Sequence, residues 1–160
     1  MKDAFADVPQ TLTDEAILQR FAASTNMPPA SATLGFRLKS VCQAERRVEV
    51  EFDARAERVA NPMGQIQGGM ICAMLDEAMS VAVGVASGMT CVAPTLEMKT
   101  SFLRPAMPGL LLAVGTVIKW GRTIAFTEGE LYDADGRLVA KASGTVLPTP
   151  FSKFKQASGA

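Results

Sequence analysis

The sequence of 160 residues contains no histidine. This absence excludes the Ser-His-Asp and Cys-His nucleophile pairs, imidazole metal ligands and every acid–base mechanism that uses an imidazole. Any catalysis must therefore use carboxylates, hydroxyls, amides and backbone dipoles. An excess of positive charge is missing too, because 16 basic residues balance 16 acidic ones. We therefore do not expect the chain to bind nucleic acid.

Cysteine is scarce, and signals for export or membrane insertion are weak. Cys42, Cys72 and Cys91 are odd in number and form no C-x-x-C pair, so we expect reduced, mostly buried thiols in a cytoplasmic protein. The first seven residues contain two acids and no apolar run, unlike a signal peptide. The uncharged stretch 78–96 is broken by glycine and proline and preceded by two acids. We interpret it as a buried helix that turns into a buried strand, not as a membrane span.

The pattern of apolar residues predicts a single domain with its core in 30–148 and loose ends at 1–10 and 151–160. A capping threonine within 11–13 opens a short helix that ends near Ala23. Strand-like alternation follows at 34–38 and 48–52. A loop rich in glycine and proline, 61–69, leads into a helix over 69–86 that is apolar nearly all round. Four more strands are predicted at 93–103, 110–120, 123–132 and 137–147.

This order predicts an α+β fold. Consecutive strands joined by tight turns at 121–122 and 133–136 make an antiparallel meander. A helix with so many apolar sides needs a sheet curved around it to bury them. The expected architecture is therefore one long central helix wrapped by a curved antiparallel sheet, with a short N-terminal helix beside it.

The start of the central helix is the candidate functional region. Gly68 and Gly69 open it, where the first N–H groups have no intrahelical acceptor and can polarise a carbonyl oxygen. Asp76 follows two turns later, roughly 12 Å along the axis, and between residues 66 and 96 only Asp76 and Glu77 are charged. Taken singly, the glycines are also compatible with a tight helix entry and Asp76 with a structural carboxylate. Glu77 is expected to face solvent or a subunit boundary.

Together these residues resemble a known family. The spacing of Asn61, Gly64, Gln67-Gly68-Gly69 and Asp76 is similar to that of the hotdog-fold acyl-CoA thioesterases of the PaaI-like branch. Four later segments are similar as well: Pro94–Met98, Phe102–Ala106, Gly121–Thr123 and Asp135–Ala140. The resemblance covers about residues 30–148 and implies the hotdog form of the fold predicted above.

The resemblance also implies roles for individual residues. Asp76 corresponds to the carboxylate that attacks the thioester carbonyl or activates water, and Asn61 to an amide that orients water or the thioester. The Gly68 N–H corresponds to the donor that polarises the carbonyl, and Thr95 to a hydroxyl that holds the nucleophilic water. In this family each site combines the loop of one subunit with the carboxylate of another. The resemblance therefore implies an obligatory homodimer, and we expect a homotetramer of two such dimers.

One position departs from the family pattern, which has histidine where this chain has Gln67. A glutamine can hydrogen-bond but cannot shuttle a proton at neutral pH. The implied activity, hydrolysis of acyl-CoA, survives if the family histidine only fixes the loop. If it takes part in the chemistry, the protein is a catalytically weak acyl-CoA binding protein. Gly69 allows a ligand to approach the helix start, and Arg104 and Arg122 are the cations expected to meet coenzyme A phosphates. We expect no metal and no separate cofactor.

Overall fold

The computed structural model describes residues 12–153. The expectation of loose ends at 1–10 and 151–160 concerns segments that lie wholly or mostly outside these residues. In chain order the elements are α1 (Asp14–Ala22), α2 (Pro29–Leu34), β1 (Phe36–Cys42), β2 (Arg47–Ala54), α3 (Ala56–Val59), α4 (Gly68–Ala86), β3 (Cys91–Val92), β4 (Thr95–Phe102), β5 (Gly109–Trp120), β6 (Ala125–Tyr132), β7 (Leu138–Val146) and β8 (Thr149–Pro150).

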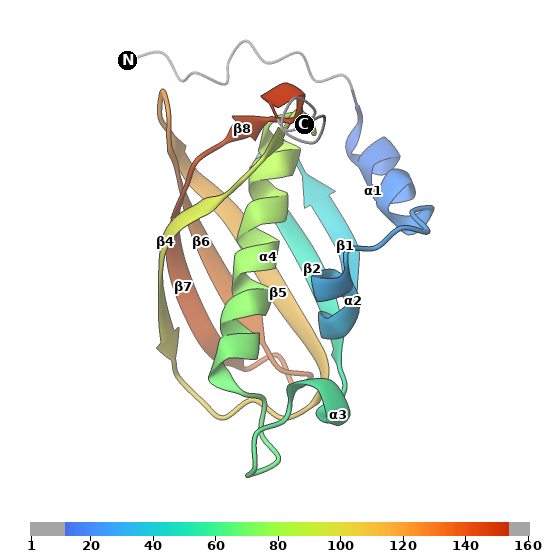
Figure 1. Cartoon of the computed structure of the whole chain (residues 1–160), viewed down its shortest axis with the longest axis vertical. Helices are drawn as coiled ribbons and strands as arrows, with labels where there is room; N and C mark the ends of the chain where they lie inside the picture. The colour runs from blue at the N-terminus through green and yellow to red at the C-terminus, as the bar shows by residue number, and fades with distance from the viewer. Residues whose placement is uncertain (1–11, 154–160) are drawn as a thin grey trace, which may run out of the picture.

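Six of the strands form one antiparallel sheet in the order β1-β2-β5-β6-β7-β4, which curves around α4 (Figure 1). The predicted meander is confirmed for β5, β6 and β7, which follow one another through tight turns. It is wrong for β4, which pairs with β7 at the far edge and not with β5. The segment 103–108 between β4 and β5 contains two prolines and crosses under the start of α4, where the Ile66 N–H donates to the Ala106 carbonyl over 2.8 Å.

The core lies between α4 and the inner face of the sheet. Alternate residues of β5 are buried against the helix, and at Gly115 the two backbones approach so closely that a Cβ would lie 2.1 Å from the Ala78 carbonyl oxygen. The predicted bounds of the helix agree with α4 to within one residue at its start. The expectation that the sheet would cover most sides of the helix is wrong, because a strip of α4 that includes Asp76 stays half-exposed between β4 and α2.

The N-terminal region contains two short helices that the sequence did not predict. Helix α1 agrees with the prediction and is capped by Thr13, whose hydroxyl accepts from the Ala16 N–H over 3.2 Å. Leu34 ends α2 and is not part of a strand, since the chain turns at Gly35 with φ 70° before β1 begins. A side chain at Gly35 would collide with the Asp53 carbonyl, as its Cβ would lie 2.4 Å from that oxygen. Helix α3 is the second unpredicted element.

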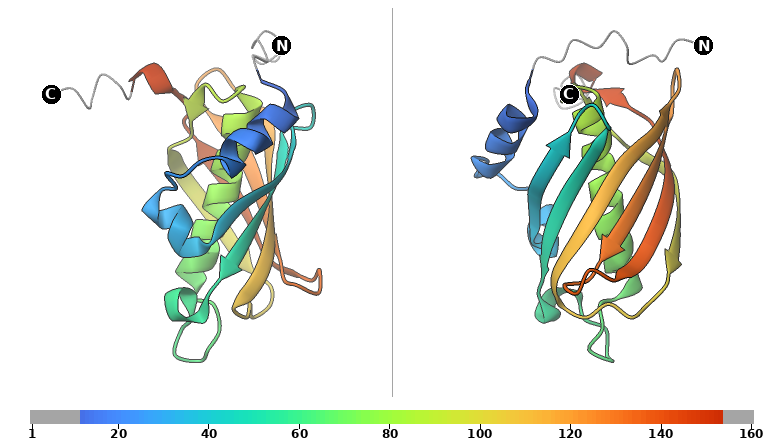
Figure 2. Two further views of the ribbon diagram at one scale, coloured as in Figure 1. Left: turned by 90° about the vertical axis from the view of Figure 1, so that its right-hand side faces the viewer. Right: turned by 180° about the vertical axis from the view of Figure 1, so that it is seen from behind.

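The two edges of the sheet differ. Strand β1 is flanked by α1 (Figure 1), whereas β4 has neighbours only on its β7 side and is largely exposed on both faces. The prediction of a buried strand after α4 is therefore wrong. Strand β4 lies at the edge of the sheet and is covered only on the side where it pairs with β7. The outer face of the sheet, turned away from α4, is open in the described residues (Figure 2).

Two further expectations concern the cysteines and the apolar helix. Cys42, Cys72 and Cys91 are unpaired, as expected, but half-buried and not buried. By length and composition α4 could cross a membrane, with a mean hydropathy of 1.5, yet 50% of that window is buried inside the fold. Such burial is that of a core helix.

Candidate active site

The loop before α4 is fixed by its own polar side chains. The Asn61 Oδ1 accepts from the backbone N–H groups of Met63, over 2.9 Å, and Gln65, over 3.2 Å. The Asn61 N–H in turn donates to the Gln65 carbonyl over 2.7 Å. The side chain that was expected to orient water or substrate thus also holds the turn that leads to the helix.

Gln67 is the N-cap of α4. Its Oε1 accepts from the Met70 N–H over 3.2 Å, and its own N–H donates to the Val59 carbonyl over 2.8 Å. A Cβ at Gly69 would lie 2.8 Å from this Oε1, so glycine at that position leaves room for the cap. Gly68 is the first helical residue, and its N–H therefore has no acceptor within the helix. The positive end of the helix dipole lies at the same place.

The carboxylate of Asp76 lies two turns further along α4, on the half-exposed strip. Its Oδ1 accepts a hydrogen bond of 2.6 Å from the Thr95 hydroxyl at the start of β4. This bond occupies one carboxylate oxygen and leaves Oδ2 for other contacts. Among the described residues no cation forms an ion pair with Asp76, so the carboxylate is both positioned and uncompensated.

The structure therefore gathers the candidate residues in two groups. Asn61, Gln67, Gly68 and Gly69 meet at the start of α4, and Asp76 meets Thr95 near its middle. The two groups lie roughly 12 Å apart along one helix axis, too far for both to contact one thioester carbonyl. Within one chain the candidate residues therefore form two separate groups.

The two candidate arginines lie at opposite ends of the sheet. Arg104 follows β4 at the end where α4 begins, and its Nη1 donates to the Leu138 carbonyl over 2.7 Å. Arg122 is exposed in the turn between β5 and β6, at the other end. Since β5 is 12 residues long, roughly 40 Å of strand separates these ends. The structure does not bring the two arginines together within one chain.

Glu77 is a residue whose environment the sequence did not reveal. It accepts a short hydrogen bond from the buried hydroxyl of Ser31 in α2 and stays half-exposed; that it faces a subunit boundary stays a prediction. Burial raises the pKa of the Glu77 carboxyl; the Ser31 hydrogen bond offsets part of this rise, and the neighbouring Asp76 carboxylate adds to it. The contact was missed because α2 itself was not predicted. The Pro28-Pro29 pair, with proline at the first helical position, was the available signal.

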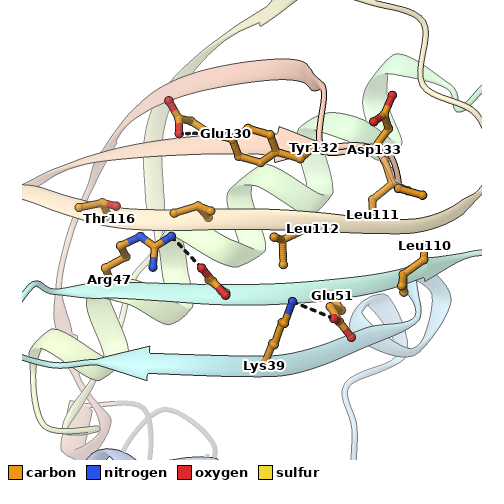
Figure 3. A pocket seen from close by; sticks show the side chains of 14 residues that line it. Lys39, Arg47, Glu51, Leu110, Leu111, Leu112, Thr116, Glu130, Tyr132 and Asp133 are labelled. Carbon is orange, nitrogen blue, oxygen red and sulfur yellow. Dashed lines mark hydrogen bonds and ion pairs between the residues drawn. The ribbon is translucent and has the colours of Figure 1, made fainter.

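A hollow of about 530 Å³ lies elsewhere on the molecule (Figure 3). It is a shallow saddle on the outer face of the sheet, with an apolar floor from β5 and a charged rim. Its charges are paired with one another: Lys39 lies 3.3 Å from Glu51, and Arg47 lies 2.8 Å from Glu49. The Tyr132 hydroxyl donates to Glu130 over 2.7 Å, and this bond raises the pKa of Tyr132. A paired rim offers no free reactive group, so Asp76 and the helix start define the candidate site.

Comparisons with known proteins agree with this fold. The family model of the thioesterase superfamily matches residues 63–140. A solved structure of a phenylacetic acid degradation-related protein from Ralstonia eutropha JMP134 is 33% identical, with a TM-score of 0.73, and the match covers 81% of this chain and 96% of that one. The PaaI protein of E. coli shares the fold at 21% identity, with a TM-score of 0.69, over 82% of this chain and 92% of that one.

One curated protein, from Saccharolobus solfataricus and named as an esterase, is 37% identical over 83 residues. The match spans 51% of this chain and 58% of that protein's length.

A curved antiparallel sheet around one long helix, shared with these structures over most of the chain, defines the hotdog class of fold. The chain belongs to the thioesterase superfamily and resembles its PaaI-like members. The family and the fold class predicted from the sequence are thereby confirmed, whereas the roles of the individual site residues stay predictions.

Proposed function

We propose that the protein hydrolyses acyl-CoA thioesters to the free acid and coenzyme A. The observation that carries this proposal is the Asp76 carboxylate, half-exposed on α4 and held by the Thr95 hydroxyl at 2.6 Å. Its place in a fold of the thioesterase superfamily makes it the candidate group for attack on a thioester. Water is the only co-reactant, so the reaction needs no metal and no separate cofactor.

In the proposed reaction, the thioester oxygen lies at the Gly68 N–H, where the helix start stabilises the negative charge that develops on it. The Thr95 hydroxyl holds Oδ1, so that the free Oδ2 of Asp76 either attacks the carbonyl carbon or takes a proton from the attacking water. When Asp76 acts as base, the C–S bond breaks and the proton that it took from water passes to the coenzyme A sulfur. When Asp76 acts as nucleophile, breaking the C–S bond leaves a mixed anhydride on Asp76; water hydrolyses it to the free acid, restores the carboxylate and supplies the proton for the thiol. Asn61 orients the water or the thioester beside the loop.

The active site is proposed to form between two copies of the chain. Strand β4 offers an unpaired edge, and an unpaired edge is a template for another strand. Antiparallel pairing of β4 with its copy runs the two α4 helices in opposite directions. Asp76 of one subunit then lies beside the Gly68 N–H of the partner subunit, which closes the gap of roughly 12 Å that separates them within one chain.

Charge on β4 favours a particular register. Glu97 and Lys99 are exposed on the outer side of the strand, on either side of Met98, and among the described residues neither forms an ion pair. A two-fold axis at Met98 places Glu97 directly opposite Lys99 of the partner subunit, and the same contact forms a second time by symmetry. Opposite charges across antiparallel strands stabilise the pairing.

The same symmetry unites the two arginines. Because the partner runs in the opposite direction, Arg104 of one subunit comes to the same end of the dimer as Arg122 of the partner subunit. Both are exposed, and guanidinium groups bind phosphates through several donors. We assign them to the phosphates of coenzyme A.

A homotetramer is proposed to form through the outer face of the sheet. Leu110 and Ile118 are more than half exposed there, near opposite ends of β5, and Phe126 lies beside Ile118. Exposed apolar side chains that gather on one face mark interaction sites. Two dimers packed over this face would bury them. The three unpaired thiols support a reducing compartment, and we place the protein in the cytoplasm.

The second candidate function is acyl-CoA binding with little turnover. Gln67 in place of the family histidine motivates it. The Gln67 side chain caps α4 over 3.2 Å, which is a geometric role that needs no proton transfer. This observation favours the enzyme.

A thiol-release assay over short, medium, branched and aryl acyl-CoAs separates the two functions. Turnover of several substrates supports the thioesterase. Thermal stabilisation by acyl-CoA without any release of thiol supports the binding protein and overturns hydrolysis. If a correctly assembled protein shows neither thiol release nor stabilisation by acyl-CoA, both functions are contradicted.

A further inference from the structure

The proposed reaction uses the two ends of a regular series of contacts but not its middle. Helix α4 meets the inner side of β4 at three points, which we call the α4–β4 row: Gly68 with Phe102, Cys72 with Thr100, and Asp76 with Thr95. In the middle contact, the Cys72 Sγ lies 3.5 Å from the Thr100 Oγ1. At the first, a Cβ on Gly68 would lie 3.4 Å from the Phe102 ring.

The spacing of the row places Cys72 midway between the two halves of the site. Residues four apart on a helix lie on one face, about 6 Å from each other along the axis. Cys72 is therefore one turn from Gly68 and one turn from Asp76. It is unpaired and half-buried, and the Thr100 contact orients it along the same open strip as Asp76.

This position acquires a meaning in the dimer, so the inference rests on the proposed function. If Asp76 faces Gly68 of the partner subunit, antiparallel symmetry places Cys72 opposite its own copy, next to the two-fold axis. One active site then lies on each side of the pair. We propose that Cys72, supported by Thr100, forms the wall between the two active sites and sets the size of the acyl group that each accepts.

The chemistry of the two ends of the substrate decides which end meets this wall. Coenzyme A carries several charged phosphates, which must remain in solvent or beside arginine. On the far side of each site the loop 61–69 is largely exposed, with Pro62, Met63 and Gly64 at the surface, and gives the coenzyme an open path. On the axis side lies a small, uncharged thiol in a half-buried contact, an environment that suits an apolar acyl group.

Variants at position 72 test the wall by changing its volume. Cys72→Phe fills the space, so kcat/KM for medium and aryl acyl-CoAs should fall by at least about tenfold relative to acetyl-CoA. Cys72→Ala opens it and should shift the preference toward larger acyl groups, with the Thr100→Val variant showing a smaller shift. Cys42→Ala and Cys42→Phe are the matched controls, because Cys42 is also free and half-buried but lies on β1 at the opposite edge of the sheet.

If the Cys72 variants change kcat/KM by one common factor for all substrates, the proposed wall is overturned, while the proposal of hydrolysis stands. Absence of hydrolysis by the wild type would instead overturn the proposed function.

A second measurement needs no activity. In a Cys42→Ser and Cys91→Ser background only Cys72 remains, and a short bismaleimide should join two subunits by adding one thiol to each of its rings. The expected product is a covalent dimer on a denaturing gel, absent when Cys72→Ala is added. Modified monomer without covalent dimer places Cys72 away from the axis and overturns the inference.

Discussion

Asp76 is the single residue whose chemistry the proposed reaction cannot replace. The Asp76→Asn variant keeps the shape of the side chain and can still accept from Thr95, but it lacks the charge needed for attack. We expect kcat to fall by at least about a hundredfold, with little change in substrate affinity. The melting temperature should hold or rise, because a half-buried charge is removed. Thiol release and thermal unfolding measured on one sample separate lost chemistry from lost structure.

The neighbouring acid supplies the control for this experiment. Glu77→Gln neutralises the adjacent side chain and should retain most of the activity. A folded Asp76→Asn protein with near wild-type turnover would remove Asp76 from the mechanism. Thr95, or a water polarised at Gly68, would then be the remaining candidates.

Glu77 gives a prediction about pH. Its carboxyl has a pKa raised above the ordinary 4.5, chiefly by burial, so the folded state binds this proton more tightly than the unfolded chain does. The wild type therefore has the full benefit below about pH 4.5 and loses it as pH rises through the raised pKa. Glutamine has no proton to lose and still accepts from Ser31. The free energy of unfolding of Glu77→Gln, relative to wild type, should increase with pH across this window in urea titrations.

A difference that does not vary with pH would mean that the Glu77 pKa is the same in the folded and unfolded states. Ser31→Ala is the useful companion variant. Without the hydroxyl, the ionised Glu77 loses its donor, so the stability gained by the Glu77→Gln substitution should become larger at neutral pH.

Most of the residues at the helix start were predictable, because turn and cap chemistry is local. The spacing of Asn61, Gln67 and Gly68 in the sequence is enough to predict a tight loop that opens a helix. The contact of Ser31 with Glu77 was not predictable, since it joins residues 46 apart in the chain through a six-residue helix with little periodic signal.

At the scale of elements, β4 carries the prediction about assembly. Glu97→Lys places two lysines beside one another at each symmetric contact, so the dimer dissociation constant should rise by roughly tenfold or more. Activity at low protein concentration should fall in parallel. The double variant, Glu97→Lys with Lys99→Glu, should restore both, because each new charge again faces its opposite. Sedimentation of dilute samples measures the dissociation constant.

The cross-strand partners of these residues on β7 are uncharged: Glu97 pairs with Thr145 and Lys99 with Ser143. The single Lys99→Glu variant should weaken the dimer as Glu97→Lys does. Equal dimerisation by all four proteins would exclude a two-fold axis at Met98.

The elements themselves were predictable where turns are short. Strands β5, β6 and β7 follow one another through the turns 121–124 and 133–137, and their pairing could be inferred from neighbouring segments. Strand β4 was placed wrongly because its partner, β7, lies about 40 residues away and no local signal names it. The exposure of β4 was not predictable either. The alternation of apolar residues does not distinguish a strand at an open edge of a sheet from one that is paired on both sides.

At the scale of the whole molecule, the fold separates the two groups that the proposed reaction combines. One helix carries a polarising N–H at its start and a carboxylate two turns later, and its rigidity prevents them from meeting. In the proposed dimer, the two-fold axis brings the N–H of one copy to the carboxylate of the other twice, once at each end of the paired helices. Activity and dimerisation should therefore be inseparable, and a stable, active 17 kDa monomer seen by light scattering would contradict the composite site.

Two kinds of heterodimer decide where the active site lies. Gly68→Pro removes the polarising N–H at the first helical position, where proline is well tolerated, and the extended backbone of Gln67, at ψ 136°, suits a following proline. Gly68→Ala keeps the N–H and should stay active. The homodimers of Asp76→Asn and of Gly68→Pro should each lose at least about a hundredfold in kcat.

Co-expressed with different tags and purified as a heterodimer, these two inactive chains should recover about half of the wild-type activity, because one composite site is intact. The converse heterodimer pairs a wild-type chain with a chain that carries both substitutions, so each of its composite sites contains one defect and it should be inactive. If each site lay within a single chain, the first heterodimer would be inactive and the second would keep about half of the wild-type activity. The two measurements therefore distinguish a site between subunits from a site within one chain.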